Sequence, residues 1–266
     1  DKIILNDLNR TTVPYQVNLH WYSCNREDGL ENFGDYLSLP VYQYMLKRFG
    51  LEEHKKLNTT KHLYAIGSIL FWGRQDATIW GSGLLNYPPE GTYRSKKFHL
   101  DIRAVRGPVT RDILLKEGFG CPEVYGDPAV LMPLIYSPPH KKSEQYSVIM
   151  HKANVQGGGK RHYISIMCQD FRTVIDQIVA SDLVISASLH GIIIAEAYGI
   201  PAIMLTDTRS DFNFLKYNDY YFSTGRYHYP VAKTVEEALD MSPAPLPDLT
   251  KMRNDLITAF PTDLWE

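Results

Sequence analysis

The sequence has 266 residues, of which 44% are hydrophobic and 22% charged, and its formal net charge at pH 7 is −2. This composition excludes a disordered chain, and the length suits one large globular domain or two smaller ones. The slightly acidic balance argues against nucleic acid as the main partner, and no apolar run reaches the roughly 18–20 residues of a membrane-spanning helix.

The N-terminal residues lack the layout of a signal peptide, so we expect a cytoplasmic protein. Cys24, Cys121 and Cys168 are widely spaced and odd in number, which predicts reduced thiols rather than disulfides or zinc ligands. Since no cluster of histidine, cysteine and carboxylate residues has the spacing of a metal site, we expect no metal.

The first long helix is predicted at residues 38–49, with Ser38 as its N-cap and Gly50 as the residue that ends it. The turn that enters this helix is Asn32-Phe-Gly-Asp35. Asn, Gly and Asp favour turns, so Asn32, Gly34 and Asp35 fit either turn chemistry or a role in a cleft.

Strands are predicted within residues 63–70 and 78–83, and each ends in a Gly- and Ser-containing turn that lets the backbone approach a ligand. Ser82 lies in the second turn. Residues 102–118 read as a strand, a tight turn and a helix, with Arg106 at the carboxyl end of the strand. A guanidinium there can bind a carboxylate or phosphate with two parallel hydrogen bonds. Residues 124–133 predict another strand and a Gly-Asp-Pro turn.

Residues 137–145 are polar and rich in Pro and Lys, which is typical of a linker. We therefore expect two domains, residues 1–138 and 139–266. The second begins with a predicted strand that ends at His151, and continues with a strand at 163–167 and a helix capped by Asp170. This alternation is typical of a Rossmann-like sheet. The intervening Gly-rich run is not a phosphate-binding P-loop, because Arg161 follows the lysine.

Residues 181–205 predict a strand, a turn, a short helix from Ile192 and a further strand, which requires a parallel pair with a crossover. The turn, residues 186–191, then lies at the carboxyl end of a strand and at a helix N-terminus, where open α/β sheets bind ligands and backbone amides favour anions. His190 in this turn can move a proton near neutral pH. The alternative is that Ser186 and Ser188 only cap the helix and that His190 is an ordinary first-turn residue.

Residues 211–226 are rich in tyrosine and contain Lys216, a cation among aromatic side chains. In the alternative interpretation its stem lies along aromatic rings and its amine stays in water. The last apolar face, within residues 252–265, predicts a terminal helix that docks across both halves.

Taken together, these fragments resemble the polysaccharide pyruvyl transferase family, and they are most similar to the branch that ketalises sugars of bacterial exopolysaccharides. They occur in the family's order over nearly the whole chain, at residues 32–35, 66–68, 80–83, 105–110, 126–129, 148–151, 185–191, 196–201 and 259–265.

The resemblance implies an α/β, GT-B-like fold, in which two Rossmann-like domains with parallel sheets face a central cleft and a C-terminal helix crosses between them. It implies transfer of pyruvate from phosphoenolpyruvate to two hydroxyls of a hexose as a cyclic ketal, without a cofactor. The first domain would bind the acceptor and the second phosphoenolpyruvate. The acceptor would be nucleotide-linked, lipid-linked or an oligosaccharide, and a lipid-linked acceptor would bring the protein to the inner face of the cell membrane.

Carried over by position, His190 is expected to be the active-site histidine, and Arg106 and Lys216 the cations that bind the donor. The expected substrate-binding residues are Ser188, Leu189, Gly191, Asn32, Gly34, Asp35, Ser82, His151 and Arg226. Asp35 and His151 would deprotonate or orient the acceptor. Some family members have arginine at the position of Ser188, so positive charge here would come from Arg106, Lys216, Arg226 or backbone amides.

Two other functions are compatible with the same motifs. Glu196-Ala-Tyr-Gly-Ile-Pro201 resembles, with one residue fewer, the pattern with which GT-B glycosyltransferases hold the ribose of a nucleotide sugar. A sugar- or partner-binding domain without catalysis is the third class.

Overall fold

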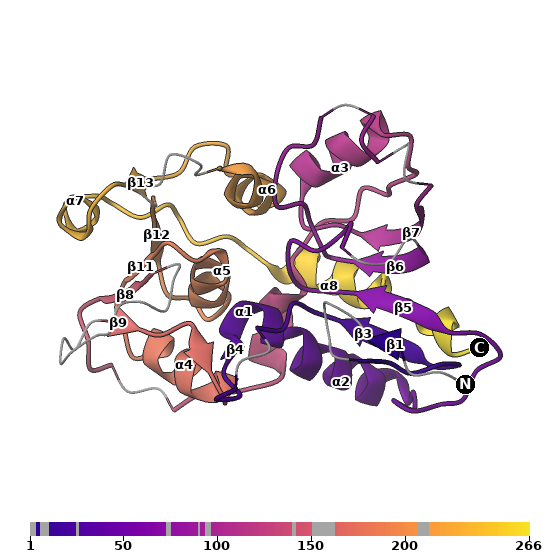
Figure 1. Ribbon diagram of the computed structural model, residues 1–266. Coiled ribbons are helices and arrows are strands. Elements are labelled where there is room, and N and C mark those ends of the chain that lie inside the picture. The colour runs from indigo at the N-terminus through magenta and orange to yellow at the C-terminus, as the bar shows by residue number, and fades with distance from the viewer. Residues whose placement is uncertain are drawn as a thin grey trace.

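The computed structural model describes residues 4–5, 11–24, 27–72, 76–89, 91–93, 97–139, 142–150, 163–206 and 213–266. Figure 1 shows two groups of elements side by side, each built around a parallel sheet. The first sheet has the order β3-β5-β6-β7 and the second the order β13-β12-β11-β8-β9. The mixed α/β class with parallel sheets is therefore confirmed.

The strands of the first sheet are β3 (Val17–His20), β5 (Lys61–Tyr64), β6 (Asp76–Trp80) and β7 (His99–Ala104). Those of the second are β8 (Ser147–Ile149), β9 (Tyr163–Ile164), β11 (Val184–Ser186), β12 (Ala202–Leu205) and β13 (Val231–Ala232). Two short antiparallel pairs join β1 (Ile4–Leu5) to β2 (Thr11–Thr12) and β4 (Glu31–Asn32) to β10 (Met167–Cys168). All residues of β11 and β12 are buried, because helices cover both faces of a parallel sheet.

The helices are α1 (Phe33–Tyr36), α2 (Ser38–Phe49), α3 (Pro108–Lys116), α4 (Phe171–Val179), α5 (Leu189–Ala197), α6 (Leu215–Ser223), α7 (Val235–Leu239) and α8 (Thr250–Thr258). Two 3-10 helices follow the same numbering, η2 (Pro128–Leu134) and η3 (Thr262–Trp265). The predictions for α2 and α4 are confirmed. Asp170 caps α4 by accepting the Arg172 N–H at 3.0 Å, and Gly50 ends α2 with φ 64°.

Three local predictions were wrong. Ser38 does not cap α2, because α1 runs into it through Leu37 in a helical conformation. The strand expected at residues 124–133 is reduced to a bridge between Val105 and Tyr125 and continues as η2, since Pro128 and Pro133 cannot donate to a ladder. The strand expected at residues 163–167 divides into β9 and β10.

Helix α5 begins at Leu189 rather than at Ile192, so His190 and Gly191 belong to its first turn. The Ser186 hydroxyl accepts the Ser188 N–H at 3.0 Å and donates to the Ser188 carbonyl at 2.7 Å, and this closes the turn immediately before the helix. The helix thus starts three residues closer to the strand than the hydrophobic pattern indicated. His151 and the Gly-rich run 157–162 lie outside the described residues.

The C-terminal segment packs against both halves. Arg253 on α8 donates to the carbonyls of Val130 and Ala197 at 2.8 and 2.9 Å, and Trp80 Nε1 donates to the Leu256 carbonyl at 2.8 Å. Beyond α8, Asp263 pairs with Arg103 at 2.7 Å. One buried core cluster consequently contains residues from β3 to η3. Within the described ranges, every helix is too short or too polar to cross a lipid bilayer.

Candidate active site

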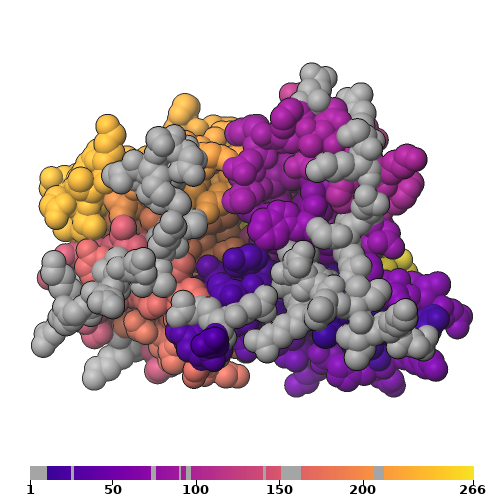
Figure 2. Space-filling model, in the orientation of Figure 1, coloured from indigo at the N-terminus to yellow at the C-terminus, as the bar shows by residue number. Residues whose placement is uncertain are grey.

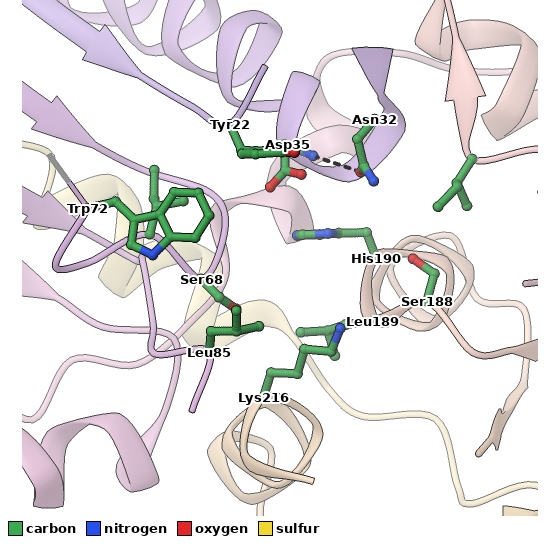
Figure 3. Close-up of a pocket in the computed structure, with 12 residues that line it drawn as sticks. Tyr22, Asn32, Asp35, Ser68, Trp72, Leu85, Ser188, Leu189, His190 and Lys216 are labelled. Carbon is green, nitrogen blue, oxygen red and sulfur yellow. Dashed lines mark hydrogen bonds between the residues drawn. The ribbon is translucent and has the colours of Figure 1, made fainter. Parts of the chain in front are cut away.

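A cavity of about 230 Å³ lies where the first turn of α5, α1 and α6 meet the loop that follows β5 (Figure 3). Both halves contribute to its wall, and Figure 2 shows the indigo surface around α1 between them. The residues that line the cavity are Tyr22, Asn32, Asp35, Ser68, Ile69, Trp72, Leu85, Ile166, Ser188, Leu189, His190 and Lys216. Five of the predicted site residues in α1 and α5, together with Lys216, therefore share one cavity.

His190 contacts a buried carboxylate behind the cavity. Its Nε2 lies 3.3 Å from Asp127 Oδ2, and the Asp127 side chain is fully buried while the His190 side chain is 12% exposed. The other oxygen of Asp127 accepts the Ala129 N–H at 3.0 Å, at the start of η2. An ionised carboxylate only accepts, so this contact favours the tautomer with hydrogen on Nε2 and orients the ring.

The ring of His190 rests on the backbone of α1. A Cβ atom on Gly34 would lie 2.0 Å from His190 Nδ1, so any side chain there would displace the ring. Asn32 caps α1, because its Oδ1 accepts the Gly34 N–H at 3.1 Å and the Asp35 N–H at 3.5 Å, and Figure 3 draws the second of these hydrogen bonds as a dashed line. Asn32 thus combines turn chemistry with a place in the cavity lining, whereas Gly34 lies against the His190 ring and is not among the lining residues.

Asp35 follows Gly34 on the same short helix, and Figure 3 shows its carboxylate directed toward His190. Burial raises its pKa to about 6, against the opposing charges of His190 and Lys216 and with a further increase from Asp127. Its Oδ1 occupies the space beside Gly67, where a Cβ would come within 2.9 Å and φ is +115°. Asp35 is therefore a carboxyl group that can exchange a proton close to neutral pH.

Lys216 enters the cavity from α6. Its Nζ lies 5.0 Å from the centre of the Tyr217 ring, and the Tyr217 hydroxyl donates to the Ala187 carbonyl at 2.6 Å. Lys216 lines the cavity, and its amine lies close to an aromatic ring. It brings a positive charge to the side of the cavity on which α5 begins.

Arg106 lies behind the cavity wall rather than in it. Its side chain is 1% exposed, and its guanidinium donates to Asp219 at 3.1 Å, to the Ser68 hydroxyl at 2.8 Å and to the Leu84 carbonyl at 2.7 Å. Asp219 also accepts from the amide and hydroxyl of Thr110 at 2.9 and 2.7 Å. The expected direct grip on an anion is therefore corrected: Arg106 holds Ser68 and α6 in position.

Arg226 is likewise engaged elsewhere. It forms two hydrogen bonds with Glu196 at 2.6 and 2.7 Å, and the Tyr220 hydroxyl donates to the same carboxylate at 2.6 Å. Neither side chain is among the described residues that line the cavity. Because both oxygens of the buried Glu196 are already used, its arrangement does not favour the ribose contact of the glycosyltransferase alternative.

Of the remaining predicted site residues, some line the cavity and others support the backbone around it. Ser188 and Leu189 line the cavity at the start of α5, which no side chain in the described part of the chain caps. Gly191 instead makes room for Ser186, whose Oγ would lie 2.3 Å from an added Cβ. Ser82 is fully buried and donates to the Gly67 carbonyl at 2.8 Å. His151 lies outside the described residues.

Sequence reasoning missed Asp127, although the Gly-Asp-Pro turn that contains it was visible as a motif. It also missed Tyr22 and Trp72, for which neither spacing nor a turn motif gave a signal. All three come from segments far from His190 in the sequence, so only the fold brings them to the site.

A family model described as polysaccharide pyruvyl transferase matches residues 28–208. The search of curated proteins found no match. Among solved structures, the chain is similar to a functionally uncharacterized protein from Klebsiella pneumoniae subsp. pneumoniae NTUH-K2044, with a TM-score of 0.48 and 12% identity over 78% of this chain and 87% of that chain. That likeness is too distant to carry an argument. The matched family range contains Asp35, Asp127 and His190 and ends before Lys216.

Proposed function

The chain belongs to the polysaccharide pyruvyl transferase family, and on that premise we propose that it moves pyruvate from phosphoenolpyruvate to two hydroxyls of a hexose, forming a cyclic ketal in a bacterial exopolysaccharide or cell-surface glycan. The observation that carries the proposal is the meeting of His190, Asp35 and Lys216 in one cavity, with Asp127 behind the histidine. These groups supply proton transfer and anion binding, the two requirements of this reaction.

The donor carries a phosphate and a carboxylate on neighbouring atoms, so its site needs concentrated positive charge. Lys216 and the backbone N–H groups at the start of α5 supply it in the proposal, since a helix N-terminus favours anions. Arg106 and Arg226 are bound to carboxylates and do not line the cavity. Lys216 and these amides therefore take the place of the arginine that some family members carry at the position of Ser188.

The reaction requires three proton transfers: one proton is added to the methylene carbon of the donor, and each of the two sugar hydroxyls that bind to C2 loses one. A proton added to the methylene carbon of phosphoenolpyruvate leaves C2 electrophilic, and the first sugar hydroxyl adds there and loses its proton. The bond from C2 to the phosphate oxygen then breaks, and the second hydroxyl closes the ketal and loses its proton. Of the two hydroxyl protons, one replaces the proton given to carbon and the other leaves with inorganic phosphate.

We assign the carbon protonation to Nδ1 of His190, because His190 lines the cavity and its Nε2 contacts Asp127. General acid catalysis contributes on the order of 10²–10⁴-fold. Asp127 stabilises the positive charge of the protonated ring and keeps it oriented. Asp35, with a pKa of about 6, is mostly ionised at neutral pH and is assigned to accept the proton of the attacking hydroxyl. No step in the proposal uses a cofactor.

The proposal includes a GT-B-like arrangement of two domains that meet near residue 139, with the first on the acceptor side and the second on the donor side. The two parallel sheets and a cavity with walls from both halves support it. We also propose a cytoplasmic location, at the inner face of the cell membrane if the acceptor is lipid-linked.

The test is incubation with phosphoenolpyruvate and candidate hexosides, oligosaccharides and nucleotide sugars, with phosphate release and a pyruvyl-sized mass gain as readouts. We expect both signals together, and both lost in His190→Ala. In a thermal-shift assay, phosphoenolpyruvate at 100 times its Kd should stabilise the protein by about 2.7 kcal/mol. Turnover of a nucleotide sugar without release of phosphate from phosphoenolpyruvate would instead identify a glycosyltransferase.

A further inference from the structure

Three large apolar side chains that line the cavity remain exposed, and two of them, Tyr22 and Trp72, pack together at the end away from Lys216 (Figure 3). Tyr22, Trp72 and Leu85 are 38%, 41% and 42% exposed, and all three line it. Exposed apolar surface inside a concave site is typical of ligand contact rather than of core packing. The proposed donor uses none of these residues, so this surface needs another occupant.

The two aromatic rings form a rigid corner. Tyr22 and Trp72 pack edge to face, with ring centres 5.7 Å apart and planes at 75°. In such a pair the ring that gives its edge keeps both faces outside the contact. The backbone of Trp72 is held at both polar groups, because its N–H donates to the Ile69 carbonyl at 2.8 Å and its carbonyl accepts from the Tyr64 hydroxyl. The corner is therefore positioned before a ligand arrives.

The chemistry of the cavity changes from one end to the other. In Figure 3, Trp72 lies across from Lys216 and His190, and Asp35 and Ser68 lie between the two ends. A phosphate or carboxylate belongs with Lys216 and α5, because Lys216 is the lysine or arginine among the described residues that line the cavity. The aromatic end instead suits a neutral ligand with an apolar face and a polar rim.

Resting on the proposed function, we propose that Trp72 and Tyr22 form the acceptor subsite, which binds a hexopyranose ring through its C–H face. The faces of aromatic rings carry partial negative charge, which attracts the polarised C–H groups on the apolar face of a pyranose. Hydroxyls at the rim of a sugar stacked there point toward Ser68 and Asp35. This places an acceptor hydroxyl beside the carboxylate that is assigned to take its proton.

Binding can be measured without catalysis. Of the four tryptophans in the chain, Trp80 and Trp265 are buried, at 0% and 2% exposure, and Trp21 is half-buried, whereas Trp72 is 41% exposed. Quenching of tryptophan fluorescence by acrylamide therefore reports strongly on Trp72. Methyl β-D-galactopyranoside and methyl β-D-glucopyranoside are the probes, and sorbitol, which has no ring face, is the control. We expect at least one glycoside to protect against quenching, sorbitol not to protect, and Trp72→Phe to remove the signal.

Steady-state kinetics give the second readout. Trp72→Ala should raise the acceptor KM about tenfold or more and leave the KM for phosphoenolpyruvate within about twofold. Trp72→Phe should retain most of the affinity, because it keeps a ring. Tyr227→Ala removes an aromatic ring that is 64% exposed and outside the cavity lining, and it should change neither constant.

The outcomes separate this subsite from the proposed reaction. An unchanged acceptor KM in Trp72→Ala, with phosphate release intact, overturns the subsite and leaves the reaction standing. Protection of Trp72 by a glycoside without any phosphate release supports the subsite and removes the donor assignment. Failure of every glycoside to protect Trp72, in a protein that turns over an acceptor, overturns the subsite.

Discussion

Lys216 and Asp219 lie one turn apart on α6, yet their side chains meet opposite surroundings. Asp219 is fully buried and bound to Arg106 and Thr110, whereas Lys216 reaches the cavity. Asp35 and Asp219 give a second contrast. Burial raises the pKa of both, but at Asp219 the Arg106 guanidinium and the Thr110 hydrogen bonds oppose it through direct contact. Arg106 and Asp219 support the wall of the cavity, whereas Lys216 and Asp35 line it.

Residue type alone therefore does not show whether a charged residue supports the cavity wall or takes part in the reaction. Arg106 and Lys216 are both cations near the same cavity, and Asp219 and Asp35 are both acids near it. What separates them is position: Arg106 and Asp219 are buried behind the wall and bound to each other, whereas Lys216 and Asp35 line the cavity. Contacts between distant segments decide that position. The following experiments test that separation.

Replacement of His190 with alanine should have the largest effect. We expect kcat/KM to fall by on the order of 10²–10⁴-fold, because the general acid is lost, whereas the urea midpoint should fall less than in Asp219→Ala, because Asp127 keeps the hydrogen bond from the Ala129 N–H. Phosphate release measures the first quantity and equilibrium unfolding the second. An unfolding midpoint that falls in parallel with activity would contradict the separation, because it would make His190 a supporting residue.

Asp219→Ala tests the other side of the comparison. It leaves the Arg106 guanidinium buried without its carboxylate, and removing one partner of a buried ion pair costs about 3–5 kcal/mol in the free energy of unfolding. Lys216→Ala, on the same helix, is the matched control and should stay within about 0.5 kcal/mol. Urea denaturation measures both. Equal stability of the two variants would show that the wall does not depend on this pair.

Gly34→Ala tests the seat of the histidine without removing a functional group. The added Cβ would lie 2.0 Å from His190 Nδ1, so the ring must move, and a displacement of about 1 Å can cost on the order of 10²-fold in rate. Gly120→Ala is the control, because an added Cβ there meets no described atom within 4 Å. Retention of full activity in Gly34→Ala would mean that the position of the ring is not limiting.

The pH dependence of stability that comes from Asp35 should be the smallest of these effects. Its sign distinguishes Asp35 from Asp219. The folded-state pKa of Asp35, about 6, is raised above the ordinary aspartate value of 3.8, so the folded protein binds more protons than the unfolded chain between these values. The contribution of Asp35 to stability therefore decreases as pH rises from about 4 to about 6. Asp35→Asn should be more stable than the parent protein at pH 7, whereas Asp219→Ala is less stable.

The same variant tests the proposed role in catalysis. Activity that needs the ionised carboxylate should decrease as pH falls through about 6, and Asp35→Asn should lose that limb together with most of its turnover. The measurements are urea midpoints at pH 4 and pH 7 and a pH profile of kcat/KM. An acid limb that persists in Asp35→Asn assigns the titration to another group.

Much of the fold could be predicted from local pattern. The 3.6-residue spacing of apolar residues located α2 and α4, and short apolar runs located strands such as β11 and β12, because burial against a core imposes these periods. Apolar spacing gave the wrong prediction for the segment just after Gly126, because two prolines convert a strand-like apolar run into the 3-10 helix η2. Position at a strand end also predicted that His190 would face a ligand cavity.

The same reasoning from strand ends gave the wrong prediction for Arg106, which was expected to bind an anion in the cavity. Its position at a strand end is correct, but its partner Asp219 lies 113 residues later in the chain, and a sequence pattern does not reveal that contact. The distance from Asp127 to His190 in the sequence, 63 residues, hid that pair in the same way. Local sequence thus located the site, and the long-range contacts decided which charged residues line the cavity and which lie behind it.

The antiparallel pairing of β4 with β10 joins the two halves of the chain, so cutting the chain between them separates parts of one site. Residues 31–36 belong to the first half in sequence but hydrogen-bond to the second, with Phe33 donating to the Ile166 carbonyl at 2.7 Å, and they form the floor under His190. Two fragments, 1–138 and 139–266, would each be inert when made separately. Mixing them should restore turnover only as far as they reassociate, so that enzyme activity becomes a direct reading of fragment complementation.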